Sequence, residues 1–191
     1  MTITLCNGKG GSGKTTLTIL LGSAMAEAGH HVGILDTDPQ KTATRWIEEI
    51  GGLTLFEEGK AYTAVLIDTP PRLECQEFTD AVSRADITIV VSSPSPADLF
   101  TSRDTVAVLE QLGAKGRAHL LFNQVQAGTI LSRELEEMAE RIGLPTLKNR
   151  MQRRQVYQHA VLMGWPSLGP EARAEVLRIA LEITDLAKVA K

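Results

Sequence analysis

A segment near the N-terminus has the residue types that bind phosphate groups. NGKGGSGKTT spans residues 7–16 and contains the pattern G-x-x-x-x-G-K-[ST] from Gly8 to Thr15. Glycines let the backbone curl so that successive N–H groups point at phosphate oxygens, and the positive end of a following helix attracts the same anion. We therefore expect a nucleoside triphosphate to contact the whole loop: Gly8, Lys9, Gly10, Gly11, Ser12, Gly13, Lys14, Thr15 and Thr16.

This loop contains two lysines, although binding of one nucleotide needs only the second. Lys14 can reach the β- and γ-phosphates, the Thr15 hydroxyl can ligate Mg²⁺, and Thr16 would contact the α-phosphate. Lys9 comes so early in the loop that it would swing away from its own γ-phosphate unless the chain folded back. From the residues alone, the simplest interpretation of Lys9 is a solvated surface lysine.

Polar residues also end three of the apolar runs. Asp36 ends HVGILD and Asp38 lies two residues further on, Asp68 ends AVLID, and Asn123 follows HLLF. Ligands of a parallel sheet bind at the carboxyl ends of its strands, where carboxylates could serve Mg²⁺ or an attacking water. An aspartate or asparagine after a strand is also an ordinary helix cap or turn residue, which is the competing interpretation.

The elements that must position these residues alternate between short β-branched runs and helical patterns. We expect strands at 2–6, 31–36, 64–69, 85–91 and 119–125. Helices are expected from the loop to Gly29 and at about 40–50, 74–83, 97–112, 130–142, 152–163 and 171–190, with one edge strand in 51–61. This alternation predicts an α/β fold, a mostly parallel twisted sheet with helices on both faces in three layers.

Composition limits the class of protein. The chain of 191 residues fits one domain, 1–191, and its hydrophobic fraction of 43% is that of an ordinary soluble protein. A net charge of −3 means that any contact with DNA must come from a local patch. We expect no signal peptide and no membrane span, and we expect Cys6 and Cys75 to be reduced thiols in the cytoplasm.

One local patch is basic. TLKNRMQRRQVYQH contains four cations within seven residues, and no acidic residue lies between Arg141 and Glu171. The candidate DNA-binding residues are Lys148, Arg150, Arg153 and Arg154. Such side chains hold phosphates without reading base sequence, whereas the alternative is a solvated helix start or a set of intramolecular salt bridges.

KGGSGKTT resembles the deviant Walker A motif of the ParA/MinD family of P-loop ATPases, and DTDPQ (36–40) resembles that family's D-x-D-P-Q switch motif. PSPADL (94–99) and NRMQRRQVY (149–157) resemble further family segments, so the resemblance covers nearly the whole chain. The short length is similar to that of small plasmid-partition members of the ParF type. We accordingly expect no N-terminal helix-turn-helix domain.

The resemblance implies roles for single residues. ATP or ADP and Mg²⁺ would be the ligands, and Lys9 would cross the interface of an ATP-dependent homodimer to the partner's phosphates, as an arginine finger does in trans. Lys9, Lys14 and Asp38 would be the catalytic residues, with Asp38 positioning or activating the attacking water. Thr15, Asp36 and Asp68 would serve Mg²⁺, and Asn123 would recognise adenine.

The resemblance also implies a function, DNA partition by a slow ATPase. Its ATP dimer would bind nucleoid DNA nonspecifically in the cytoplasm, and a ParB- or ParG-like centromere-binding protein would stimulate hydrolysis. Alternatives are the positioning of a carboxysome or chemotaxis cluster, and a MinD-like membrane-associated regulator. We expect no membrane partner, because the 171–190 helix mixes both charges on its polar side and lacks an aromatic anchor. A kinase would need a lid, and amide ligases of this fold lack the lysine and D-x-D-P-Q pair.

Overall fold

The computed structural model describes residues 1–189 of the chain, and within them six strands form one sheet. The strands are β1 (Thr2–Cys6), β2 (Val32–Asp36), β3 (Thr54–Leu55), β4 (Ala64–Asp68), β5 (Ile87–Ser92) and β6 (Ala118–Phe122). They lie in the order β3-β2-β4-β1-β5-β6, and every pair is parallel. The expected parallel sheet is confirmed, including the short edge strand in 51–61.

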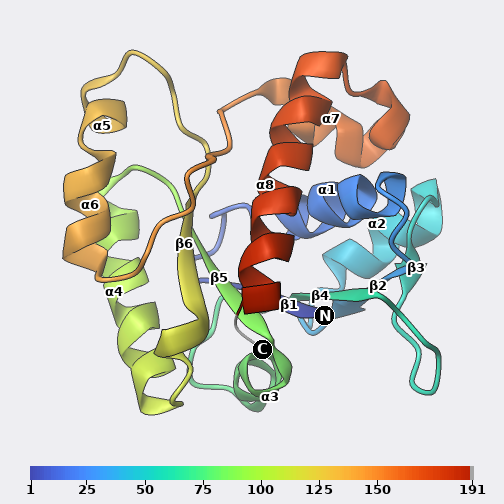
Figure 1. Ribbon diagram of the computed structural model, residues 1–191, viewed down its shortest axis with the longest axis horizontal. Coiled ribbons are helices and arrows are strands. Elements are labelled where there is room, and N and C mark those ends of the chain that lie inside the picture. Colours follow the sequence, from blue (N-terminus) through green and yellow to red (C-terminus); the bar gives the residue numbers. More distant parts are fainter. Residues whose placement is uncertain (190–191) are drawn as a thin grey trace.

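Helices cover both faces of this sheet, which gives the expected three layers (Figure 1). One face carries α1 (Lys14–Glu27), α2 (Thr42–Ile50), α7 (Gln155–Met163) and α8 (Pro170–Val189). The other carries α3 (Gln76–Arg84), α4 (Pro96–Gln111), the single turn α5 (Ile130–Arg133) and α6 (Leu135–Ile142). Short 3₁₀ turns lie at Lys115–Arg117 and Trp165–Ser167.

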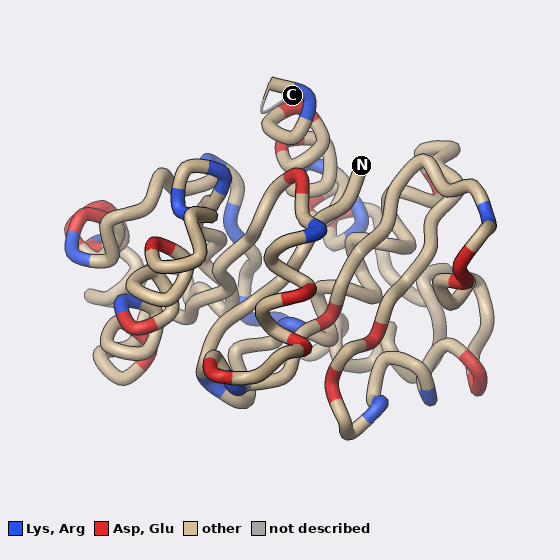
Figure 2. Tube along the Cα trace, turned by 90° about the horizontal axis from the view of Figure 1, so that it is seen from below, with Lys and Arg blue, Asp and Glu red and all other residues tan. Residues whose placement is uncertain are grey.

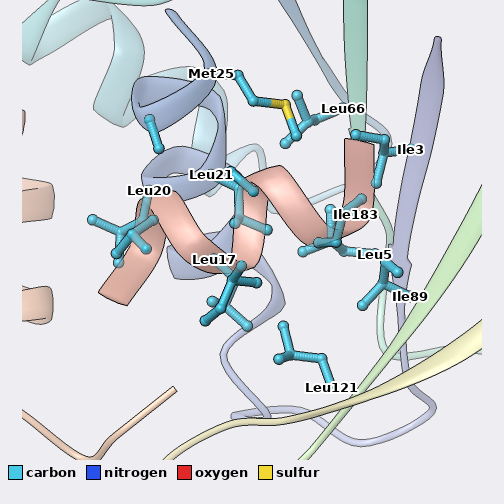
Figure 3. Close-up of a cluster of buried hydrophobic side chains, with 14 of the residues drawn as sticks. Ile3, Leu5, Leu17, Leu20, Leu21, Met25, Leu66, Ile89, Leu121 and Ile183 are labelled. Atoms are coloured by element: carbon cyan, nitrogen blue, oxygen red, sulfur yellow. The ribbon is translucent and has the colours of Figure 1, made fainter. Parts of the chain in front are cut away.

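The core on the α1 side fixes the helix that begins at the phosphate loop. Figure 3 shows Leu17, Leu21 and Met25 of α1 among strand side chains such as Leu66, with Ile183 of α8 close by. All of these side chains are almost completely buried. Because α1 contacts both the strands and α8, its start is held against the carboxyl end of the sheet.

Strand register brings the aspartates together. Asp36 at the end of β2 is the direct neighbour of Asp68 at the end of β4. On its other side, Asp68 neighbours Leu5 of β1. Parallel strands that end in register place their following loops at one edge of the sheet. The loop after β1 and both aspartates therefore share that edge.

Two expected helices differ clearly in their bounds, and the end of a third is not tested. The stretch 130–142 is not one helix, because Glu134 leaves helical geometry (φ −98°, ψ 11°) and α6 then packs Leu135 and Met138 into the second core. The helix expected from 152 begins only at Gln155, because backbone bonds of Met151 and Arg153 with Val125 keep that stretch extended beside β6. Residue 190, the end of the last expected helix, lies outside the described residues.

Candidate functional site

The phosphate loop ends in a tight approach that only glycine permits. Gly13 lies directly before α1 at φ +94°, and a Cβ there would come within 2.2 Å of Asn123 Nδ2. Among the described residues, no side chain caps the start of α1 by a hydrogen bond. The first N–H groups of α1 therefore remain available to an anion in the loop.

Lys14 is the buried lysine of the loop. It is only 6% exposed, and its Nζ donates to the carbonyl oxygen of Lys9 at 3.0 Å. Burial lowers the pKa of Lys14, while the negative charge of Asp68 acts in the opposite direction. A buried ammonium whose one hydrogen bond among the described residues goes to a loop carbonyl is placed to receive a phosphate.

Asp68 is the buried carboxylate opposite Lys14. It is 1% exposed, and neither carboxylate oxygen has a hydrogen-bond partner within the described part of the chain. Burial raises the pKa of Asp68 to about 7, although Thr15 and Lys14 oppose this rise. The Ser12 hydroxyl is likewise buried and unpartnered there. Orphaned oxygens beside a phosphate loop fit a hydrated Mg²⁺ with its phosphates.

Asp36 and Asp38 have local partners. Both oxygens of Asp36 are occupied, Oδ1 by the Asp38 N–H at 3.0 Å and Oδ2 by the N–H and hydroxyl of Thr44 at 2.9 and 3.0 Å. Asp38 Oδ1 accepts from the Gln40 N–H at 2.9 Å. The observed contacts make Asp36 a brace between β2 and α2, while its expected role toward Mg²⁺ stays a prediction.

Lys9 lies at the rim of the loop, in a setting unlike that of Lys14. Its side chain is 39% exposed, and its Nζ forms an ion pair with Asp98 in the first turn of α4. Asp98 is 2% exposed in its side chain. PSPADL contains this aspartate, but its pairing with Lys9 could not be predicted, because the two partners lie 89 residues apart.

Three amide side chains hold the loop in place, a role that the sequence did not predict for any of them. Asn7 Nδ2 donates to the Val91 carbonyl at 2.7 Å, which ties the start of the loop to β5. At the far side, Asn123 Nδ2 donates to the Ser12 carbonyl at 2.8 Å, and Gln124 Nε2 donates to that of Gly11 at 3.2 Å. Asn123 thus lies against the loop, and its amide braces the loop backbone.

A pocket of about 120 Å³ opens beside these braces. Gly13, Thr16, Asn123 and Tyr157 line it together with the chain from Met151 to Arg154. It is smaller than the pockets that enclose whole ligands, so it would hold only one end of a nucleotide. Its place beside Thr16 is compatible with the base end, and the adenine role of Asn123 stays a prediction.

The segment 148–154, the basic segment from here on, does not present its four cations alike. All four are exposed, but Arg154 pairs with Glu171 and Glu175 of α8, each at 3.4 Å. No ion pair is found for Lys148, Arg150 or Arg153 in the part of the chain that the structure describes. Figure 2 shows acidic and basic residues interspersed elsewhere along the trace.

The basic segment also divides between two hollows. Lys148 and Arg150 line a groove of about 450 Å³ against α6, whereas Arg153 and Arg154 line the pocket beside the phosphate loop. Its path is fixed by two carboxylates of α8. Glu182 accepts the N–H groups of Lys148 and Asn149 at 2.6 and 2.9 Å, and Glu175 accepts that of Gln152 at 2.6 Å.

Comparison with known proteins gives consistent results. The model of the CobQ/CobB/MinD/ParA nucleotide binding domain matches residues 3–164. A curated relative, "Maintenance of carboxysome distribution protein A" of Halothiobacillus neapolitanus, is 28% identical over 85% of this chain and 84% of its own length. Among solved structures, the Aquifex aeolicus MinD cell division protein has a TM-score of 0.80 at 19% identity, covering 96% of this chain and 97% of that one. A Cyanothece McdA–ATP complex has a TM-score of 0.75 at 15% identity, covering 96% of each chain.

Proposed function

Because the chain belongs to the CobQ/CobB/MinD/ParA nucleotide-binding family, we propose that it is an ATPase that dimerises with bound MgATP and positions a cargo along DNA. The observation that carries this proposal is the pair of lysines in the phosphate loop, of which Lys14 is buried and Lys9 is at the rim. One lysine serves the nucleotide of its own subunit, and the other is accessible to a second subunit.

Within one subunit, the loop N–H groups and Lys14 bind the β- and γ-phosphates, and Thr16 contacts the α-phosphate. Thr15 and Asp68 would hold a hydrated Mg²⁺, and Asp36 would support them by fixing the loop after β2. Bound Mg²⁺ supplies positive charge to the phosphates during transfer. Asp38 positions the attacking water, and its backbone is held by Asp36.

Between subunits, Lys9 reaches the partner's phosphates. A cation delivered only when two subunits close makes hydrolysis depend on dimerisation, as an arginine finger does. The side chain starts at the rim and its backbone N–H is fixed to Asn7 Oδ1 at 2.9 Å, so the side chain alone has to move.

DNA contact comes from Lys148, Arg150 and Arg153, with a smaller share from Arg154. A single subunit offers few cations, and the ATP dimer doubles them. Nonspecific affinity rises steeply with the number of neutralised phosphates, since log K changes with log salt at a slope of roughly −0.9 per contact. Nucleotide state would thereby control residence on the nucleoid.

The cargo is inferred from relatives. Two relatives that cover 85% and 95% of this chain are named for carboxysome distribution, which favours a large protein cargo. Plasmid or chromosome partition with a ParB- or ParG-like adaptor is the second candidate, supported by the family. Membrane binding is disfavoured, because Val176, Ile179 and Ile183 of α8 are completely buried in the core. No helix of the described residues is long and apolar enough to cross a bilayer.

Two measurements test the proposal. Sedimentation velocity should show a dimer with a non-hydrolysable ATP analogue and a monomer with ADP. Fluorescence anisotropy on unrelated duplexes over a salt series should show binding only in the ATP state, with the same affinity for each sequence. Equal DNA affinity with ADP and ATP would contradict the DNA switch, and strong binding to anionic liposomes would favour a membrane regulator.

Neighbouring genes for shell proteins, or for a small basic DNA-binding protein, would separate the two cargoes.

A further inference from the structure

The partner of Lys9 within its own subunit is a buried carboxylate at the start of α4. Asp98 is 1% exposed, and its Oδ2 accepts the Ser93 N–H at 3.0 Å while its Oδ1 faces Lys9. The Ser95 hydroxyl accepts the Asp98 N–H at 3.2 Å, so Ser95 caps the helix and fixes this turn.

Lys9 gives this carboxylate its charge partner. Burial raises the pKa of Asp98, but bonds from Lys9 and Ser93 outweigh burial and hold the pKa below its usual value. Asp98 forms no other ion pair within the described residues. Removing Lys9 from it leaves a buried carboxylate with backbone and hydroxyl partners alone, which is unfavourable.

We propose that Asp98 is a positioning residue that holds Lys9 on its own subunit and must release it before the ATP dimer closes. This inference rests on the proposed role of Lys9 in the partner's site. An ammonium paired with α4 of one subunit has to leave that carboxylate to contact phosphates of another. Asp98 thereby sets a threshold for dimerisation without touching the nucleotide.

The ion pair can be tested without any nucleotide. Asp98→Asn keeps the size of the side chain and an acceptor for Ser93, but it removes the charge that holds Lys9. Brief acylation of the apoprotein, followed by peptide mass spectrometry, should show faster labelling of Lys9 in Asp98→Asn than in the wild type. Asp104→Asn, an exposed change on the same helix, is the matched control and should label Lys9 at the wild-type rate. Equal labelling of Lys9 in Asp98→Asn and the wild type would overturn the proposal that Asp98 restrains Lys9.

The threshold is tested by the dimer dissociation constant with a non-hydrolysable ATP analogue. Asp98→Asn should dimerise about threefold to tenfold more tightly, the range of a partly exposed ion pair, and should stay monomeric with ADP. Asp98→Ser gives a second, smaller variant if the amide destabilises the fold, which thermal unfolding reports. If folded Asp98 variants dimerise no more tightly than the wild type while Lys9→Ala cannot dimerise, the proposal that Asp98 opposes dimerisation is wrong. The role of Lys9 in trans would still stand in that case. Normal dimerisation of Lys9→Ala would overturn the role of Lys9 in trans and this inference with it.

Discussion

The phosphate loop and the basic segment adjoin one pocket, yet they are built in opposite ways. In the loop, Lys14 is buried and the backbone is held by Asn7, which follows β1, and Asn123, which follows β6. In the basic segment, Lys148, Arg150 and Arg153 are exposed and form no ion pair within the described residues, while Glu175 and Glu182 hold the backbone. Substitutions in the phosphate loop should therefore abolish ATP-dependent function. Substitutions in the basic segment should lower DNA affinity gradually, one contact at a time.

The largest effect should follow from Lys14→Ala. Loss of the buried cation leaves the β- and γ-phosphates without their main charge partner, so ATP affinity should fall by about 100-fold or more. Titration with a fluorescent ATP analogue measures this. Lys9→Ala is the matched control and should bind within about threefold of the wild type, because Lys9 serves the other subunit. Equal losses in both variants would remove the distinction between the two lysines.

Asp38→Ala should leave ATP binding intact and slow hydrolysis by about 100-fold, since water positioning acts on the chemical step. The ATP dimer should consequently persist in gel filtration after ATP is diluted. Glu49→Ala, an exposed change on α2, controls for effects on the neighbouring helix. Hydrolysis at the wild-type rate would exclude this role of Asp38.

A smaller effect is expected from Arg153→Glu in the basic segment. Each charge reversal should lower nonspecific DNA affinity of the ATP dimer by about tenfold at moderate salt and should flatten the salt slope, because two subunits each lose a contact. Anisotropy across a salt series provides both quantities. ATP-dependent dimerisation should be unchanged. A loss of ATP binding as large as in Lys14→Ala would break the contrast between the two regions.

The smallest effect should come from Arg154→Ala. Its guanidinium is already paired with Glu171 and Glu175, so DNA affinity should change by about twofold or less. The same titration compares it with Arg153→Ala. A larger loss in Arg154→Ala than in Arg153→Ala would show that the ion pairs open when DNA binds.

Local patterns predicted the parts of the site that are contiguous in sequence. The loop from Gly8 to Thr15 and the aspartates after β2 and β4 are readable because strand, glycine turn and helix follow one another. Contacts such as Lys9 with Asp98, or Gln124 with Gly11, join residues 89 and 113 positions apart, which no local pattern encodes. The basic residues looked equivalent for the same reason, because the carboxylates that pair with Arg154 lie on α8.

The two glutamates of α8 fix the position of the basic segment without determining which side chains it presents. Glu175 and Glu182, seven residues apart on one helix, grip the main chain of the basic segment and leave most of its side chains uninvolved. Point substitutions in that segment can thus alter its charge and shape while its path over the protein stays the same. Successive point substitutions during evolution could therefore change which polymer or cargo this surface binds, and each variant along the way would still fold.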